Sequence, residues 1–199
     1  MTPTADRDLA CQLAGTDSDG ALRVARRITD PWFRAQALAC VARYAAEPLV
    51  ERLANEALQS SRQATDAFRV VGSAAWPVRA LLERDRRKAA HQALTDVLAV
   101  VREISPPASR AQALALLWEA AFPGGAELRE PILASIRQHS PPDGHWRAAR
   151  LYRCLAATLA TEDPESADRL VASMPAGPAK EKGRRDRQGG IASAPRPFF

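Results

Sequence analysis

The amino-acid sequence predicts an all-α protein, a short α-solenoid of about four helical hairpins with a period near 38 residues. Three observations predict this class. The apolar residues are mainly alanine and leucine, which are the strongest helix formers. A six-residue segment occurs twice without change, at 34–39 and at 110–115. Proline-containing turns precede both copies. Because one hairpin cannot bury its apolar face alone, repeats of this kind stack on one another.

The repeated segment reads Arg-Ala-Gln-Ala-Leu-Ala, and its two copies lie 76 residues apart, which is twice 38. A degenerate copy lies between them and another follows them. We call the arginine that marks each copy an anchor arginine. The four are Arg34, Arg69, Arg110 and Arg147, spaced by 35, 41 and 37 residues.

The segments before the anchor arginines predict tight turns between two helices. Segments 28–31, 104–107 and 139–144 contain one or two prolines each, whereas 65–66 is only Thr-Asp. Proline disfavours helix in the residue before it and suits the first turn of the next helix. Thr, Ser and Asp side chains can cap that helix start.

Apolar residues at helical spacing then predict the helices in order. A capping segment, 1–18, contains a short helix over 5–14. The first helices of the hairpins are expected at 19–28, 50–63, 87–104 and 127–138. The second helices are expected at 31–46, 66–83, 108–122 and 145–160. A further first helix over 164–174 has no partner after it. Pro77 should kink its helix, and Pro131 should delay the start of its own.

The positive charge belongs mainly to the C-terminal segment. Residues 176–199 hold six basic and two acidic residues, whereas the rest of the chain holds 22 and 21 and is nearly neutral. The segment is rich in glycine, proline and charge, which predicts a disordered basic tail. The expected organisation is therefore a capping segment at 1–18, a repeat array at 19–175 and the tail at 176–199.

The pattern A..L..A..I.DP..RAQALA..A resembles the degenerate tetratricopeptide-like or HEAT-like α-α repeats that are common in bacterial proteins. The resemblance covers roughly residues 19–174. It departs from the tetratricopeptide pattern, because the Trp, Leu-Gly and Tyr of the first helix are missing and the period is longer. The resemblance implies a scaffold that binds a protein or peptide on its curved face.

No pattern of catalytic residues stands out. The chain has no GxSxG elbow and no glycine-rich loop after a strand, so no catalytic or cofactor-binding residue is assigned and no cofactor is expected. His139, Asp143 and His145 could form a metal or acid–base pair, but a polar loop between helices explains them better. The cysteines, Cys11, Cys40 and Cys154, are far apart and odd in number, which favours free thiols.

The anchor arginines are open to two interpretations. In one they line up along the array and bind an anionic partner. In the other each arginine packs on the neighbouring hairpin and pairs with an acid such as Asp30 or Asp66. Trp32 and Trp146 each precede an anchor arginine, and either would be a candidate contact residue if exposed.

The leading hypothesis is a non-enzymatic scaffold for a protein or peptide. One alternative is a HEAT-like nucleic-acid-binding protein that uses the repeated arginines and the basic tail. Another is a terminal fragment of a longer array that associates with itself through an exposed end. The chain begins without the features of a signal peptide and lacks an apolar stretch of membrane-spanning length, so a cytoplasmic location is expected.

Overall fold

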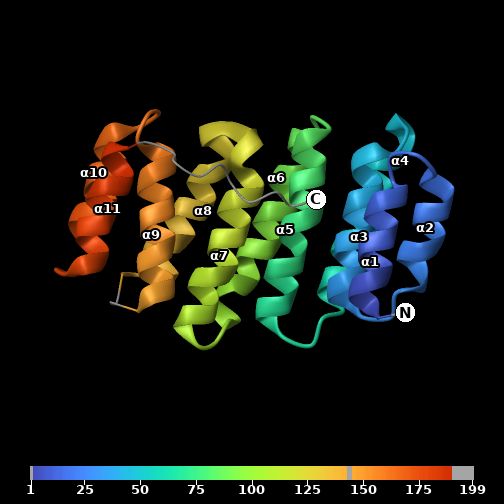
Figure 1. Ribbon diagram of the computed structural model, residues 1–199, viewed down its shortest axis with the longest axis horizontal. Coiled ribbons are helices and arrows are strands. Elements are labelled where there is room, and N and C mark those ends of the chain that lie inside the picture. The colour runs from blue at the N-terminus through green and yellow to red at the C-terminus, as the bar shows by residue number, and fades with distance from the viewer. Residues whose placement is uncertain (1, 143–144, 190–199) are drawn as a thin grey trace.

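The computed structural model describes residues 2–142 and 145–189, and within them it contains helices and no strand. The all-α prediction is confirmed. Figure 1 shows the helices side by side along the long axis, from α1 and α2 at one end to α10 and α11 at the other. The helices are α1 (Pro3–Leu13), α2 (Ser18–Arg27), α3 (Pro31–Tyr44), α4 (Glu47–Arg62), α5 (Ala67–Glu83), α6 (Arg87–Val100), α7 (Pro107–Ala121), α8 (Gly125–His139), α9 (Trp146–Leu159), α10 (Pro164–Ser173) and α11 (Pro178–Gln188). Two short 3₁₀ turns, η1 (Val101–Glu103) and η2 (Phe122–Gly124), follow α6 and α7.

The helices alternate between two layers. The odd-numbered helices form an unbroken series in which each contacts the next odd-numbered helix, from α1 to α11. The even-numbered helices lie against this series, and each contacts at least one odd-numbered neighbour. Consecutive even-numbered helices contact each other much less, so the odd-numbered layer carries the core from one end of the molecule to the other.

Side-chain composition explains which helix belongs to which layer. In α3 every residue from Ala35 to Ala42 is buried, and the corresponding stretch of α7 is nearly as enclosed. Half of the residues from Ala35 to Ala42 are alanines, whose small side chains let neighbouring helix axes approach closely. The even-numbered α2 and α4 bury only one stripe and present charged residues on the opposite side.

The turns define the helix starts as the sequence predicts. Asp30 caps α3, because its carboxylate accepts hydrogen bonds from the backbone N–H groups of Trp32 (2.8 Å) and Phe33 (3.3 Å). Asp66 caps α5 in the same way through Arg69 N–H, at 2.8 Å. Pro31 and Pro107 occupy first-turn positions, where a missing N–H costs nothing.

The C-terminal segment corrects the sequence prediction. Residues 178–188 form helix α11, which packs on α9 and α10, so this part of the expected disordered tail is ordered and the helix predicted at 164–174 does have a partner. Its charges find partners on the helices it covers: Asp186 pairs with Arg153 at 2.6 Å, and Arg187 with Asp168 at 2.9 Å. Residues 190–199 lie outside the described residues.

Both prolines predicted to disturb their helices are accommodated within them. Pro77 is buried inside α5, which runs on to Glu83. Pro131 lies inside α8, which begins at Gly125 rather than late. The prediction of a delayed start was wrong, because the buried Leu128, Ile132 and Ile136 on one face of α8 hold the helix in place although Pro131, which is exposed, removes one backbone hydrogen bond.

Within residues 2–142 and 145–189, no helix combines the length and the apolar character that crossing a membrane requires.

Candidate functional site

Arg34 and Arg110 hold adjacent elements of the fold together. Arg34 Nε donates to Ser60 Oγ at 2.9 Å and its Nη2 donates to Gln63, which joins the start of α3 to the end of α4. Arg110 donates to the carbonyl of His139 at 2.9 Å and to that of Ile104 at 2.8 Å. These carbonyls end a helix or a helical turn and have no partner within it, so Arg110 acts as a C-terminal cap.

Arg69 joins α5 to the neighbouring α3. Its Nη2 donates to both carboxylate oxygens of Asp30, at 2.9 and 2.8 Å. Burial alone would raise the pKa of Asp30, but the hydrogen bonds from Arg69 and from the α3 backbone outweigh it and hold that pKa below its ordinary value. Asp30 thus serves both as the cap of α3 and as the link to α5.

The tryptophans beside the anchor arginines differ from each other. Trp32 is half-buried, stacks on Phe68 with ring centroids 6.1 Å apart, and lies against Gly72 of α5. A Cβ at Gly72 would be 2.8 Å from the Trp32 ring, so this glycine makes room for the indole. Trp146 is 62% exposed and stacks on its neighbours His145 and Arg147 at the start of α9.

The histidine-rich turn has a structural role on its described side. His145 is the N-cap of α9, and its Nδ1 accepts a hydrogen bond from the backbone N–H of Arg147 at 3.2 Å. Asp143 lies outside the described residues. Across the part of the chain that is described, no three His, Cys, Asp or Glu side chains gather as a metal site would require.

Two cysteines that are distant in sequence lie on contacting helices. Cys11 of α1 is half-buried and Cys40 of α3 is buried. Their thiols interact, and this hydrogen bond, together with burial, raises the pKa of Cys40 while the bond lowers that of Cys11. Both are free thiols.

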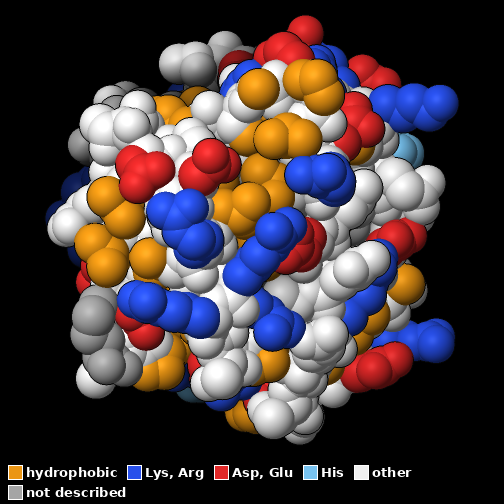
Figure 2. Space-filling view, turned by 90° about the vertical axis from the view of Figure 1, so that its right-hand side faces the viewer, with side chains coloured by type: hydrophobic (Ala, Val, Ile, Leu, Met, Phe, Trp, Pro, Cys, Tyr) orange, Lys and Arg blue, Asp and Glu red, His pale blue; other side chains and the backbone are white. Residues whose placement is uncertain are grey.

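Charges on the N-terminal end of the stack are mixed in sign. Figure 2 views this end and shows basic side chains next to acidic ones around a group of apolar side chains. The half-buried Leu9, Leu13 and Leu22 belong to the helices at this end, α1 and α2.

Ion pairs link α2 to α4 and α4 to α6 among the even-numbered helices. Arg26 in the last turn of α2 binds Glu56 of α4 through two hydrogen bonds, at 2.9 and 2.8 Å. Arg62 at the end of α4 binds Asp96 of α6 at 2.8 Å. Arg137 has the equivalent place in α8, but its carboxylate partner is Glu130 of the same helix, at 3.9 Å. In the described chain the C-terminal turn of α8 has no such link to α10.

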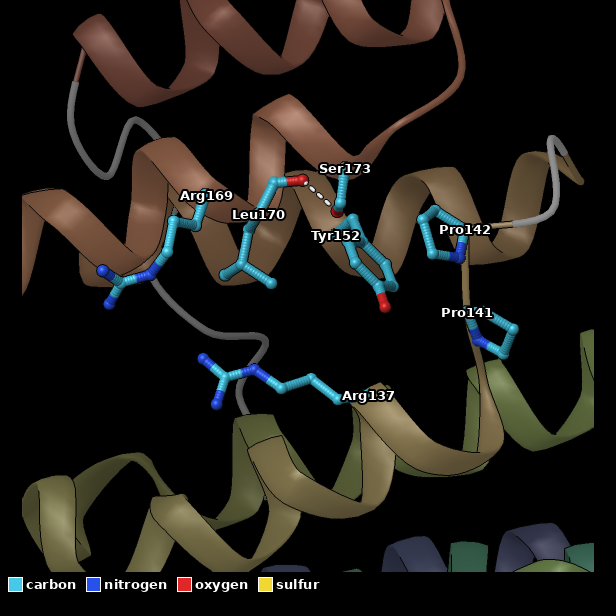
Figure 3. A pocket seen from close by; sticks show the side chains of 7 residues that line it. All are labelled: Arg137, Pro141, Pro142, Tyr152, Arg169, Leu170 and Ser173. Carbon is cyan, nitrogen blue, oxygen red and sulfur yellow. Dashed lines mark hydrogen bonds between the residues drawn. The ribbon is translucent and has the colours of Figure 1, made fainter.

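A pocket of about 440 Å³ opens beside the C-terminal turn of α8. Figure 3 shows it between α8 and α10, with α9 behind. Tyr152 of α9 points its hydroxyl into the space, and the prolines of the α8–α9 turn close one end. The lining residues are Arg137, Pro141, Pro142, Tyr152, Arg169, Leu170 and Ser173.

The charged side chains that line the pocket are basic. Arg137 and Arg169 contribute guanidinium groups from opposite walls, and the lining includes no acidic side chain. Burial raises the pKa of Tyr152, and the charge of Arg137 partly opposes that rise, so the hydroxyl stays protonated at neutral pH and can donate a hydrogen bond. The same two arginines help to hold the pKa of Asp163 low, after hydrogen bonds from Ser166.

The residues singled out from the sequence meet in pairs, Arg69 with Trp32 and Arg147 with Trp146, but they do not form one site. The anchor arginines are distributed over α3, α5, α7 and α9, and the pocket contains none of them. Sequence reasoning missed Arg137 and Arg169 because each is one of many arginines on an exposed helix face. Comparison of the chain with protein-family models, curated proteins and solved structures gives no match.

Proposed function

We propose that this chain is a non-catalytic helical scaffold that binds a protein or peptide partner through the layer of even-numbered helices. The observation that supports the proposal is the pocket between α8 and α10, on the side of this layer. A pocket walled by three helices and bearing two arginines suits recognition of a partner. It lacks a nucleophile held by a base, and so it offers no acid–base pair for chemistry.

The resemblance to tetratricopeptide-like and HEAT-like repeats supports the same proposal by analogy, because such arrays commonly bind proteins. A bacterial origin and a cytoplasmic location belong to the proposal as well. The free thiols Cys11 and Cys40, from helices in contact, fit a reducing compartment.

The nucleic-acid alternative stays a prediction without a specific observation in its favour. It needs anchor arginines that are available on an open surface, whereas Arg34, Arg69 and Arg110 donate to partners within the fold. Binding to generic DNA with a steep dependence on salt would support it. The self-association alternative assumed an uncovered helix at 164–174, and α11 now covers that helix.

Site-specific photo-crosslinking in a lysate of the native host tests the proposal. A benzoylphenylalanine placed at Ser173, inside the pocket, should capture one discrete protein or peptide. The same group at the exposed Arg23 of α2, remote from the pocket, is the matched control. Equal capture at Ser173 and Arg23 would contradict binding of the partner at the pocket. Substrate turnover by the purified protein, abolished by a point mutation, would overturn the scaffold function itself.

A further inference from the structure

We infer that the pocket between α8, α9 and α10 recognises a peptide segment in which a carboxylate side chain stands beside an apolar one. This inference rests on the proposed function and assigns a ligand class to it. It follows from the separation of cationic and apolar groups along the pocket, from the unused hydrogen-bond donors of its arginines, and from the carboxylates that lie near them at the start of α10.

The cationic end of the pocket is formed by two arginines from different helices. In Figure 3 the side chains of Arg137 and Arg169 extend in the same direction along the pocket, away from the proline turn. A guanidinium group carries five N–H donors in a planar fork that matches a carboxylate. Two guanidinium groups at one end therefore favour a ligand with a negative charge there.

Neither guanidinium is saturated by its partners within the protein. Arg137 reaches Glu130 only at 3.9 Å, and the two side chains are 47% and 66% exposed. Arg169 donates to Glu165 at 2.6 Å and to Ser166 at 2.8 Å, one bond from each of two nitrogens. Its remaining N–H groups are available. A single-turn pair between exposed side chains is weak, so a ligand carboxylate can compete with it.

The other end of the pocket is apolar. Pro141 and Pro142 form its end wall, and Leu170 and the ring of Tyr152 form its sides. The Tyr152 hydroxyl lies between the two ends and can donate to a ligand oxygen. A volume of about 440 Å³ holds an apolar side chain together with a neighbouring acidic one.

The position of the pocket favours a carboxylate over a phosphate. Both guanidinium groups lie near carboxylates at the start of α10, because Arg169 donates to Glu165 and both arginines lower the pKa of Asp163. The negative charge of these carboxylates disfavours a dianion more strongly than a monoanion. No lining residue belongs to the first turn of a helix, where backbone N–H groups would otherwise bind a phosphate.

The test uses small probes and NMR titration of the full chain. The principal probe is 3-phenylpropionate, which joins a carboxylate to a phenyl ring. Its neutral amide, 3-phenylpropionamide, acetate and phenyl phosphate are the comparison probes. We expect 3-phenylpropionate to shift the Tyr152 and Leu170 resonances and to bind about tenfold tighter than the amide, which lacks the charge. Acetate, without the ring, should bind more weakly as well.

The variants are Arg137→Gln and Arg169→Gln, with Arg23→Gln as the matched control. Each pocket variant should weaken 3-phenylpropionate binding about tenfold and leave amide binding unchanged. Arg23→Gln, on the exposed face of α2, should change neither. Circular dichroism of each variant checks that the fold is intact. A charge-reversed chain carrying R137E and R169E should instead prefer the cationic 3-phenylpropylamine, which gives a gain of binding that misfolding cannot produce.

Equal binding of the acid and the amide, or unchanged affinity in both glutamine variants, would overturn the inference. Tighter binding of phenyl phosphate than of 3-phenylpropionate would overturn the choice of carboxylate. These failures are distinct from failure of the proposed function. Probe binding as expected, together with no protein captured at Ser173, would contradict the scaffold and support the ligand chemistry. Capture of a protein at Ser173, together with unchanged probe affinity in both glutamine variants, would support the scaffold and contradict the ligand chemistry.

Discussion

Ion pairs join neighbouring even-numbered helices in the N-terminal half of the molecule, whereas among the described residues of the C-terminal half α6 and α8, and α8 and α10, have no such pair. Ion pairs from the last turns of α2 and α4 reach the next even-numbered helix, through Arg26 to Glu56 and Arg62 to Asp96. Arg137 has the equivalent place in α8, yet a pocket separates this turn from α10. Both halves have the same two-layer arrangement.

The difference teaches that similar positions in a repeated arrangement can have different partners. Asp168 of α10 stands at the corresponding distance in sequence from Arg137, but it pairs with Arg187 of α11, at 2.9 and 3.2 Å. Arg137 is left with a distant partner on its own helix, and its guanidinium group lines an open space.

The largest expected effect tests the core of the C-terminal half. Trp118 of α7 is fully buried and its indole N–H donates to Thr158 of α9 at 3.0 Å. Trp118→Ala removes a large side chain and leaves Thr158 without its donor, so the free energy of unfolding should fall by about 3–5 kcal/mol. Urea denaturation measures this. The matched control is Trp146→Ala, at an exposed position, which should cost less than about 0.5 kcal/mol. Similar losses in both variants would contradict the assigned packing.

The N-terminal half depends on close approach rather than on a large buried ring. Gly72→Ala places a Cβ 2.8 Å from the Trp32 ring, and the fold should lose about 1–3 kcal/mol because the indole must move. Gly15→Ala, where the nearest atom is 3.6 Å away, is the control. Intrinsic tryptophan fluorescence should shift in Gly72→Ala alone. A stabilised Gly72→Ala variant would show that helix propensity outweighs the contact.

The Asp30–Arg69 link predicts a pH dependence that is confined to acid. The folded-state pKa of Asp30 lies below the ordinary value of 3.8, so its contribution is fully present above that value. The contribution is lost as the pH falls through the lower folded pKa, when the carboxylate is protonated. As the pH falls below 4, the free energy of unfolding should therefore decrease by about 1 kcal/mol less in Asp30→Asn than in the wild type. Thermal denaturation between pH 2 and pH 7 is the measurement. If the stability of the variant and of the wild type fell equally below pH 4, the Asp30–Arg69 link would be excluded as the cause.

The smallest effect concerns the ion pairs that define the comparison. Arg62 and Asp96 are 57% and 41% exposed, so Arg62→Gln should cost less than about 1 kcal/mol, and the cost should vanish in high salt. Faster hydrogen exchange at the end of α4 and in α6 would show that the pair also holds the two helices together. Unchanged exchange would mean that the ion pair does not hold α4 and α6 together, and that the odd-numbered layer sets the spacing of these helices.

Much of the local structure could be predicted from the sequence alone. Alanine and leucine at helical spacing determined the helices, and the Asp-Pro turn at residues 30–31 determined where α3 begins. The recurrence of the anchor arginines indicated equivalent positions on successive second helices. These features are local, because capping and helix propensity act within a few residues of the chain.

The tertiary structure decided the rest. The sequence of 178–188 looks like solvated tail, and only contact with α9 and α10 makes it a helix with paired charges. Several arginines meet carboxylates that are 30 or more positions away in sequence, as Arg69 meets Asp30. Asp168 meets Arg187 of α11 rather than Arg137, whose guanidinium group lines the pocket. Which of several carboxylates an arginine pairs with depends on the positions of whole helices, and no local sequence pattern predicts these positions.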